Sequence, residues 1–253
     1  MKNDKNIEHL RYDDRAQSLL AAGNDAIEAT PDFGSLTVSP IYRAPYIFYE
    51  QCIRKHIKKK QDVLELGAGT GLHTFALVQT GARVVASDIS SFSLAVVAQR
   101  INSVKTCVAD MESLPFEANT FDVVTSAGSL SYGDPITVDA EIRRVLRPGG
   151  LFICVDSLNH NPVYRLNRWL HFKRGERTRS TMLRMPTLKR IESISKGFKD
   201  TDIHFFGAVS YIMSILARII GQEQAAKVSD TVDRLVRVRR AAFKFVLVAR
   251  GRL

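Results

Sequence analysis

Between residues 63 and 156, short apolar runs alternate with stretches of helical character, and this alternation narrows the choice of fold more than any other feature of the chain. The apolar runs, each of strand length, are residues 63–66, 83–88, 106–110, 121–128 and 151–156. Helices are expected at 73–81, 90–101 and 134–146, where Asp134 can cap the last one and Pro135 fits its first turn. Such alternation is typical of a parallel sheet covered by helices.

The pattern continues past residue 156 with longer interruptions. A helix is expected at 187–198, and two further strands are expected at 202–207 and 243–250. Residues 208–220 and 230–240 have the character of two inserted helices, and the first sixty residues are largely helical around a loop at 31–40. We therefore predict an α/β fold with a seven-stranded, mostly parallel sheet and helices on both faces. An N-terminal helical extension or lid would cover 1–60, and the main domain, 61–253, would carry a helical insertion at 208–241.

The composition fits a globular chain of one domain, since 45% of the 253 residues are apolar and 25% are charged. The cysteines Cys52, Cys107 and Cys154 lie far apart without a CxxC pair, so neither a disulfide framework nor a zinc site is expected. The longest nearly uncharged run, from Gly207 to Arg218, is too short to cross a bilayer, and the first residues lack the apolar core of a signal peptide. A cytoplasmic location is expected.

The segment ELGAGTG at 65–71 places three glycines between the first strand and the following helix. Glycine permits positive φ and lets backbone approach a ligand closely, so a nucleotide-type cofactor is a natural guest, although a tight turn without a ligand uses the same glycines. Asp88 ends the second strand 19 positions after Gly69 and can accept both hydroxyls of a ribose. Asp110 ends the third strand, where it can accept an adenine amino group while Met111 covers the ring. Taken singly, either aspartate could instead cap a helix.

Together these residues resemble the class I S-adenosylmethionine-dependent methyltransferases. The similarity is carried by ELGAGTG at 65–71, by Asp88 at the end of VVASD, by ADMESLPFEANTFDVV at 109–124 and by VLRPGGLF at 145–152. It covers residues 60–156 closely and the last two strands more loosely, and it implies a Rossmann-like fold with S-adenosyl-L-methionine as cofactor. A dehydrogenase is less favoured because GAGTG lacks the spacing of the pyrophosphate-binding GxGxxG.

The resemblance also implies which residues hold the cofactor. The glycine loop would wrap the methionine portion, Glu65 would order that loop and the amino end, Asp88 would bind the ribose, and the stretch after the third strand would bind the adenine. Ala127 would line the path of the methyl group. Tyr42, Arg43 and Tyr46, in IYRAPYIFYE, are expected to close over the donor from the N-terminal side, unless this aromatic face packs in the core. The full predicted set is Glu65, Gly67, Ala68, Gly69, Gly71, Asp88, Ile89, Asp110, Met111, Ala127 and Tyr42.

The predicted catalytic residues follow the fourth and fifth strands, at the edge where sheets of this kind bind ligands. An oxygen nucleophile needs its proton removed, and His160 in DSLNHNP is the candidate base, with Asp156 able to assist or replace it. Tyr132 in SLSYGD is a candidate for contact with substrate. Alternatives stay open, because His160 can instead cap a turn with Asn161 and Pro162, and Tyr132 can be a packing residue.

Residues 161–190 contain nine lysines and arginines against the single Glu176, in a chain whose formal charge is +10. This segment leaves the fifth strand beside the expected donor site. It is predicted to form a basic flap over 161–186 that grips phosphate or carboxylate, or else a solvated face. The expected substrate contacts of the basic flap are Tyr164, Arg168, Arg177, Arg179 and Arg184.

The resulting hypothesis is a methyltransferase that acts on a small, anionic acceptor. O-methylation of a sugar or sugar phosphate is favoured, since the basic flap is similar to that of bacterial polysaccharide-associated sugar methyltransferases. Two alternatives stay open: an RNA methyltransferase that uses the same charges, and a non-catalytic scaffold that keeps the cofactor fold. Nucleic acid is the less favoured partner because the fourth strand ends in SAG instead of a DPPY-like segment. No metal site and no membrane span are predicted, and a homodimer through the inserted helices stays open.

Overall fold

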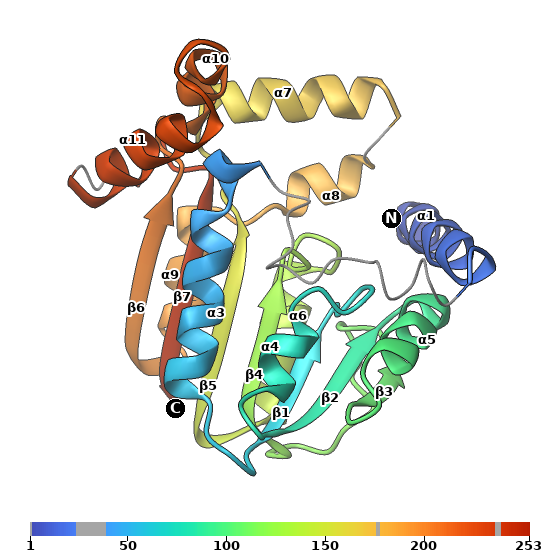
Figure 1. Ribbon diagram of the computed structural model, residues 1–253. Coiled ribbons are helices and arrows are strands. Elements are labelled where there is room, and N and C mark those ends of the chain that lie inside the picture. Colours follow the sequence, from blue (N-terminus) through green and yellow to red (C-terminus); the bar gives the residue numbers. More distant parts are fainter. Residues whose placement is uncertain (1, 24–38, 176–177, 236–238) are drawn as a thin grey trace.

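Seven strands form one sheet in the order β3-β2-β1-β4-β5-β7-β6 (Figure 1). The computed structural model describes residues 2–23, 39–175, 178–235 and 239–253. The strands are β1 Asp62–Leu66, β2 Arg83–Asp88, β3 Lys105–Val108, β4 Phe121–Ala127, β5 Leu146–Ser157, β6 Phe198–Phe206 and β7 Lys244–Arg252. The first five strands pair in parallel, and β7 runs antiparallel to both β5 and β6. The predicted fold, a seven-stranded and mostly parallel sheet, is confirmed.

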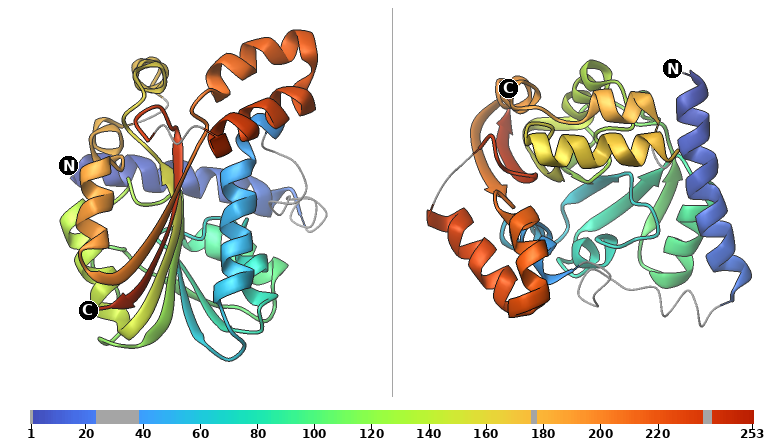
Figure 2. Two further views of the ribbon diagram at one scale, coloured as in Figure 1. Left: turned by 90° about the vertical axis from the view of Figure 1, so that its left-hand side faces the viewer. Right: turned by 90° about the horizontal axis from the view of Figure 1, so that it is seen from above.

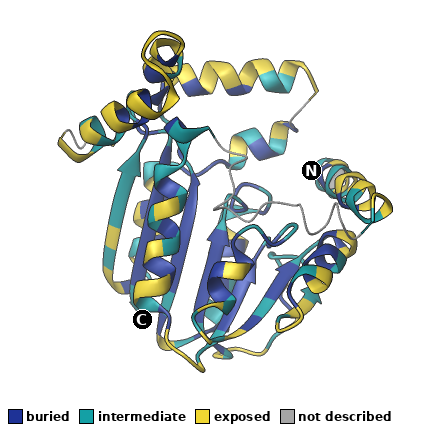
Figure 3. Ribbon diagram, viewed as in Figure 1, coloured by how far each residue is buried: buried dark blue, intermediate teal, exposed yellow. Residues whose placement is uncertain are grey.

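Helices cover both faces of the sheet (Figures 1 and 2). One face carries α3 (Ala44–His56), α4 (Thr74–Val78) and α5 (Ser91–Arg100), and the other carries α6 (Pro135–Val145) and α9 (Leu188–Ser195). Alternate residues of each strand face opposite layers. Thus Val63 packs with Tyr49 of α3, whereas its neighbour Leu64 joins the core that contains Ile142 and Ile191. Figure 3 shows the strands as the most buried part of the molecule.

The remaining helices gather at the carboxyl edge of the sheet, where the parallel strands end (Figure 1). They are α1 Lys2–Ala21, the short 3-10 helix η2 Pro40–Tyr42, α7 Pro162–Lys173, α8 Arg179–Arg184, α10 Ser210–Ile220 and α11 Gln222–Leu235. The helix α1 lies beside α5, with Ala16 packed on Val96. The predicted N-terminal extension therefore divides into two parts, because α1 lies at this edge while α3 belongs to the layer that covers β5 and β7.

The predicted helix start at Asp134 is confirmed, since its carboxylate accepts the Thr137 N–H at 3.1 Å. The predicted end of that helix also agrees with the observed end at Val145, but the predicted start of the next strand is wrong. The sequence suggested that Arg-Pro-Gly-Gly separates the helix from a strand at 151, but β5 already begins at Leu146. A register shift between Phe121 and Val123 on β4 accommodates the extra residues, and Gly149 adopts the positive φ of +79° that the bulge requires.

Two other boundaries also differ. The strand β6 begins at Phe198, earlier than the predicted 202, and α9 correspondingly ends at Ser195. The second inserted helix is α11, which begins at Gln222 and not at 230. Its first half buries only the small side chains Ala225 and Ala226, which give a weak apolar pattern in the sequence. The predicted loop at 31–40 lies almost wholly outside the described residues.

Candidate functional site

The glycine loop follows β1 at the carboxyl edge, and its first two glycines are required for different reasons. Gly67 has φ +65°, and a Cβ there would lie 2.5 Å from the Ser129 Cβ, so close packing excludes a side chain. Gly69 has φ +54° and faces open space, with nothing within 4 Å of the position that a Cβ would take. Its N–H donates to Asp88 Oδ2 at 2.9 Å, and the other oxygen of Asp88 accepts the Ser90 N–H at 2.9 Å. Asp88 thus ties the end of β2 to the glycine loop.

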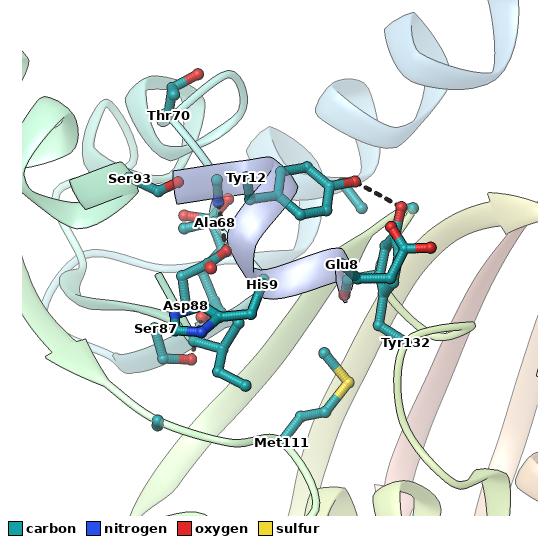
Figure 4. A pocket seen from close by; sticks show the side chains of 18 of the residues that line it. Glu8, His9, Tyr12, Ala68, Thr70, Ser87, Asp88, Ser93, Met111 and Tyr132 are labelled. Carbon is teal, nitrogen blue, oxygen red and sulfur yellow. Dashed lines mark hydrogen bonds between the residues drawn. The ribbon is translucent and has the colours of Figure 1, made fainter. Parts of the chain in front are cut away.

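A cavity of about 650 Å³ opens beside this loop, and we call it the glycine-loop cavity (Figure 4). Every predicted cofactor residue lines it except Gly71 and Tyr42. A Cβ at Gly71 would instead meet Val97 of α5 at 3.2 Å, so this glycine serves the packing of the turn. The predicted residues that line the cavity are Glu65, Gly67, Ala68, Gly69, Asp88, Ile89, Asp110, Met111 and Ala127.

Two buried carboxyl groups set the electrostatics of the glycine-loop cavity. Burial raises the pKa of Glu65 to about 7, although the Thr74 hydroxyl, which donates to it at 2.6 Å, opposes the shift. Burial also raises the pKa of Asp88, against the hydrogen bonds from the backbone of Ser90 and Gly69. A cationic ligand would favour the charged form of both groups, so the cavity suits a ligand with positive charge.

The helix α1 lies across the glycine-loop cavity and supplies residues that the sequence analysis missed (Figure 4). Tyr12 and Tyr132 approach with their hydroxyl oxygens 2.5 Å apart, and their rings meet edge to face. Lys5 forms an ion pair with Asp110, the predicted adenine acceptor. Glu8 accepts hydrogen bonds from the Thr178 N–H and the Thr181 hydroxyl, at 3.2 and 3.1 Å, which joins α1 to the start of α8. No sequence motif indicates these contacts, because the two residues of each contact lie more than a hundred positions apart along the chain.

A second cavity of about 570 Å³ adjoins the first, and we call it the tyrosine cavity. Its walls contain six aromatic side chains, which come from α1, α3, α7 and the segments beside them: Tyr12, Tyr42, Tyr46, Tyr132, Tyr164 and Phe243. Its charged lining residues are Glu8, Arg11, Arg15, Arg168 and Lys244. The two cavities share Glu8, Tyr12, Arg15, Tyr46, Tyr132 and Thr181. The two cavities therefore adjoin along a common wall.

Of the predicted catalytic residues, only Tyr132 lies in the site, where it lines both cavities. His160 lines neither, and its Nε2 accepts the Leu188 N–H at 2.9 Å; burial lowers its pKa. Asp156 is fully buried beneath the site and accepts the N–H groups of Leu130 and Ser157. His160 and Asp156 therefore both accept backbone N–H groups, and the partner of His160 is the first residue of α9 and not the turn at Asn161 and Pro162.

The predicted substrate residues divide in a similar way. Tyr164 and Arg168 line the tyrosine cavity, where Arg168 donates to the Leu158 carbonyl at 2.9 Å. Arg184 lines neither cavity; it donates to the Tyr132 carbonyl at 3.3 Å and pairs with Glu112 at 3.7 Å. Arg179 is exposed on α8 and lines neither cavity. Arg177 lies outside the described residues.

Tyr42 was expected to close over the donor, but it does not line the glycine-loop cavity. Its hydroxyl lies 2.6 Å from Ser214 Oγ on α10, and its ring packs edge to face on Phe243 in the wall of the tyrosine cavity. Tyr46, which belongs to the same prediction, lies one turn further along the chain and lines both cavities.

Two absences are limited to the described residues. Among them there is no cluster of three or more histidine, cysteine or acidic side chains that could hold a metal ion. Within the same ranges, no helix combines the length and the apolar character needed to cross a bilayer. The cysteines Cys52, Cys107 and Cys154 are free.

Comparison with known proteins agrees with this architecture. Residues 64–154 match the model of a methyltransferase domain family. A demethylmenaquinone methyltransferase of Clavibacter sepedonicus is 33% identical over 165 residues, which is 63% of this chain and 60% of that protein. A protein of the same name from Corynebacterium kroppenstedtii is 39% identical over 121 residues, which is 46% of this chain and 52% of that protein. The chain thus spans less than two thirds of the length of these relatives.

The fold also matches solved structures. Phosphoethanolamine N-methyltransferase 2 of Haemonchus contortus, solved with S-adenosylmethionine, superimposes with a TM-score of 0.58 at 19% identity, covering 84% of this chain and 53% of that one. The matched family model and this fold agree with the motif set at 65–71, 88, 109–124 and 145–152. Residues 64–154 thus match a methyltransferase domain, and the chain has the fold of the class I S-adenosylmethionine-dependent methyltransferases.

Proposed function

We propose that this chain transfers a methyl group from S-adenosylmethionine to a small acceptor that binds in the tyrosine cavity. The observation that carries the proposal is the adjacency of the two cavities, which share Tyr12, Tyr46 and Tyr132 in their common wall. A donor in one compartment and an acceptor in the other would then meet at these tyrosines. Methyl transfer needs the donor and the acceptor bound in neighbouring sites, so that the reacting atoms can approach each other.

The residues of the glycine-loop cavity fit the donor. Gly69 leaves space where any side chain would intrude, which suits close approach of a ligand to backbone. Asp88 offers a buried carboxylate at the end of β2 for the ribose hydroxyls, and Met111 lies beside the position proposed for the adenine (Figure 4). Glu65 lies where a carboxylate would favour the cationic methionine end. When bound, S-adenosylmethionine supplies the methyl group as part of a sulfonium.

The part played by the protein in such a transfer is mainly orientation. Holding two reactants in line can contribute roughly 7 to 11 kcal/mol to lowering the barrier. Positive charge is lost during the transfer, so a site from which water is excluded favours the reaction. The helix α1 closes over the glycine-loop cavity through Tyr12, and Glu8 links it to α8, which gives this chain a means of excluding water.

The acceptor that these walls favour is planar. The tyrosine cavity is lined by six aromatic side chains, which stack more readily on a flat ring than on a saccharide. Relatives named for demethylmenaquinone, whose name contains a quinone, point the same way. The O-methylation of a sugar is therefore not part of this proposal. The cytoplasmic location, the homodimer and the RNA alternative stay untested predictions.

Donor binding tests the first half of the proposal. We expect S-adenosylmethionine and S-adenosylhomocysteine to bind the purified chain in calorimetric titrations, and NADH not to bind. The variant Gly69→Val should lose this binding, because its side chain would fill the space beside the glycine loop. Gly149→Val is the matched control, since Gly149 also has a positive φ, of +79°, and open space around it, but lines neither cavity.

Turnover tests the second half. Formation of S-adenosylhomocysteine should rise when planar aromatic acceptors are added, and it should not rise with sugar phosphates. Equal donor affinity in wild type and Gly69→Val would contradict the donor site. Tight donor binding without turnover on any acceptor would favour the scaffold alternative.

A further inference from the structure

We propose that Lys244 is the anchor for an anionic oxygen on the acceptor, so that the tyrosine cavity selects a planar aromatic molecule that carries a carboxylate or an ionised hydroxyl. This inference rests on the proposed function, because it names the class of acceptor for the same site. Lys244 belongs to none of the motifs that indicate the family. It begins β7, opposite Ser157 at the end of β5.

The ammonium group of Lys244 is buried, and it forms no direct ion pair with a carboxylate of the described residues. The residue is 6% exposed, and it lines the tyrosine cavity. Its Nζ donates one long hydrogen bond, 3.4 Å, to the Ser157 hydroxyl, and no carboxylate of the described residues comes within ion-pair distance. An ammonium has three donors, and burying a charge without partners is costly. A ligand oxygen in the cavity would give these donors the partner that the protein does not supply.

Aromatic rings hold the ammonium in place but leave its donors available. Nζ lies 4.8 Å from the ring centre of Tyr46 and 5.4 Å from that of Phe243. Phe243 is itself fixed between Tyr42 and Tyr164, whose ring centres lie 5.3 and 5.0 Å away. Cation–π contacts stabilise a cation without consuming its N–H groups in strong hydrogen bonds. The ammonium of Lys244 therefore lies against the aromatic rings that line the tyrosine cavity. A planar acceptor bound there would contact the same rings.

The surrounding charges favour an anion. Asp156 lies beneath the cavity; burial raises its pKa and Lys244 opposes that shift, but both of its oxygens already accept backbone N–H groups. Among the residues that line the tyrosine cavity, the only acidic one within the described ranges is Glu8, which pairs with Arg11 at 2.8 Å. Arg15 and Arg168 add further positive charge to the same walls. The cavity is therefore cationic as a whole.

The anchor also has a suitable position relative to the donor. Tyr46, on which the ammonium of Lys244 rests, lines both cavities. An acceptor whose oxygen binds Lys244 would extend its ring along Tyr46 toward the wall shared with the glycine-loop cavity. One charged contact at a fixed point would thus select the acceptor and set its orientation for the transfer.

Binding of three matched probes, with S-adenosylhomocysteine present, tests this proposal. Cinnamate is planar and anionic, cinnamamide is planar and neutral, and 3-cyclohexylpropanoate is anionic without a ring face. We expect calorimetric titration to find cinnamate bound at least about tenfold more tightly than either of the other two probes, in keeping with a charge-assisted contact added to stacking. S-adenosylhomocysteine has no methyl group to transfer, so binding is measured without turnover.

Variants then separate the anchor from the fold. Lys244→Met should lose the preference for cinnamate over cinnamamide, whereas Lys244→Arg should retain most of it. Lys173→Met is the matched control, because the Lys173 ammonium also rests on a ring, 5.5 Å from the Trp169 centre, but lines neither cavity. It should leave all three affinities unchanged.

The outcomes distinguish this inference from the proposed function. S-adenosylhomocysteine that fails to bind wild type contradicts the proposed function itself. Normal S-adenosylhomocysteine binding with equal cinnamate affinity in wild type and Lys244→Met overturns the anchor alone. If Lys244→Met does not fold, the wild-type comparison decides, since a chain that binds cinnamate no better than cinnamamide has no anion anchor.

Discussion

Replacing Glu65 by glutamine should change how the stability of this protein depends on pH. Glu65 is 2% exposed at the end of β1, and its carboxyl is held by the Thr74 hydroxyl. Burial raises its pKa from 4.5 to about 7. Glutamine keeps an oxygen to accept the Thr74 hydrogen bond but cannot ionise, so Glu65→Gln removes the titration and little else.

The expected magnitude follows from the difference between the two pKa values. The folded state holds the Glu65 proton more tightly than the unfolded state, so stability falls as pH rises from about 4.5 through about 7. The difference between the unfolded-state pKa of 4.5 and the folded-state pKa of about 7 corresponds to roughly 3 kcal/mol of unfolding free energy. This stabilisation is fully present below pH 4.5 and is lost above the folded-state pKa. Wild type and Glu65→Gln should therefore diverge across this window.

Urea unfolding at a series of pH values between 4.5 and 8.5 measures the divergence. We expect the difference in unfolding free energy between Glu65→Gln and wild type to grow by about 3 kcal/mol in favour of the variant as pH rises. Parallel pH profiles would refute the reasoning, because they would mean that Glu65 is solvated or paired in a way that this structure lacks. Bound S-adenosylmethionine should reduce the divergence, since its positive charge favours the ionised carboxylate.

Two further substitutions test the packing of the site and its support. Gly67→Ala should weaken S-adenosylhomocysteine binding at least about tenfold in calorimetric titration, because its Cβ would lie 2.5 Å from Ser129 and displace the glycine loop; unchanged affinity would mean that the loop adapts freely. Arg190→Met should cost about 3–5 kcal/mol in urea unfolding, because it leaves Asp139 buried without the ion pair at 2.8 Å; a loss below about 1 kcal/mol would contradict a buried pair.

The sheet and the glycine-loop cavity were predictable because their signals are local in the sequence. Each strand is a short apolar run, and each strand end that faces the site carries its functional residue within the same segment, as Asp88 and Asp110 do. Parallel strands deliver such ends to one edge of the sheet. The sequence therefore predicts a shared pocket even though these residues are separated along the chain.

The closure of the site was not predictable in the same way. Tyr12 reaches Tyr132 across 120 positions, and Glu8 reaches Thr178 across 170. The helix α1 has no strong apolar stripe that would indicate which face it presents, since it packs on α5 through small contacts such as Ala16 on Val96. The position of His160 was not predictable for a related reason, because its imidazole accepts the Leu188 N–H from another segment.

Charge shows most clearly where reading a sequence locally misleads. The run of basic residues at 161–190 predicted an anion-binding segment. However, two of its arginines form ion pairs with acids that are distant along the chain: Arg184 with Glu112, and Arg190 with Asp139. Lys244 follows a second basic run, which includes Arg239 and Arg240, and begins the strand β7. Its ammonium is buried in the wall of the tyrosine cavity, where it donates one long hydrogen bond to Ser157. If Lys244 is the anchor that we propose, burial in a cavity wall identifies the residue that selects the acceptor, and the density of charge along the sequence does not.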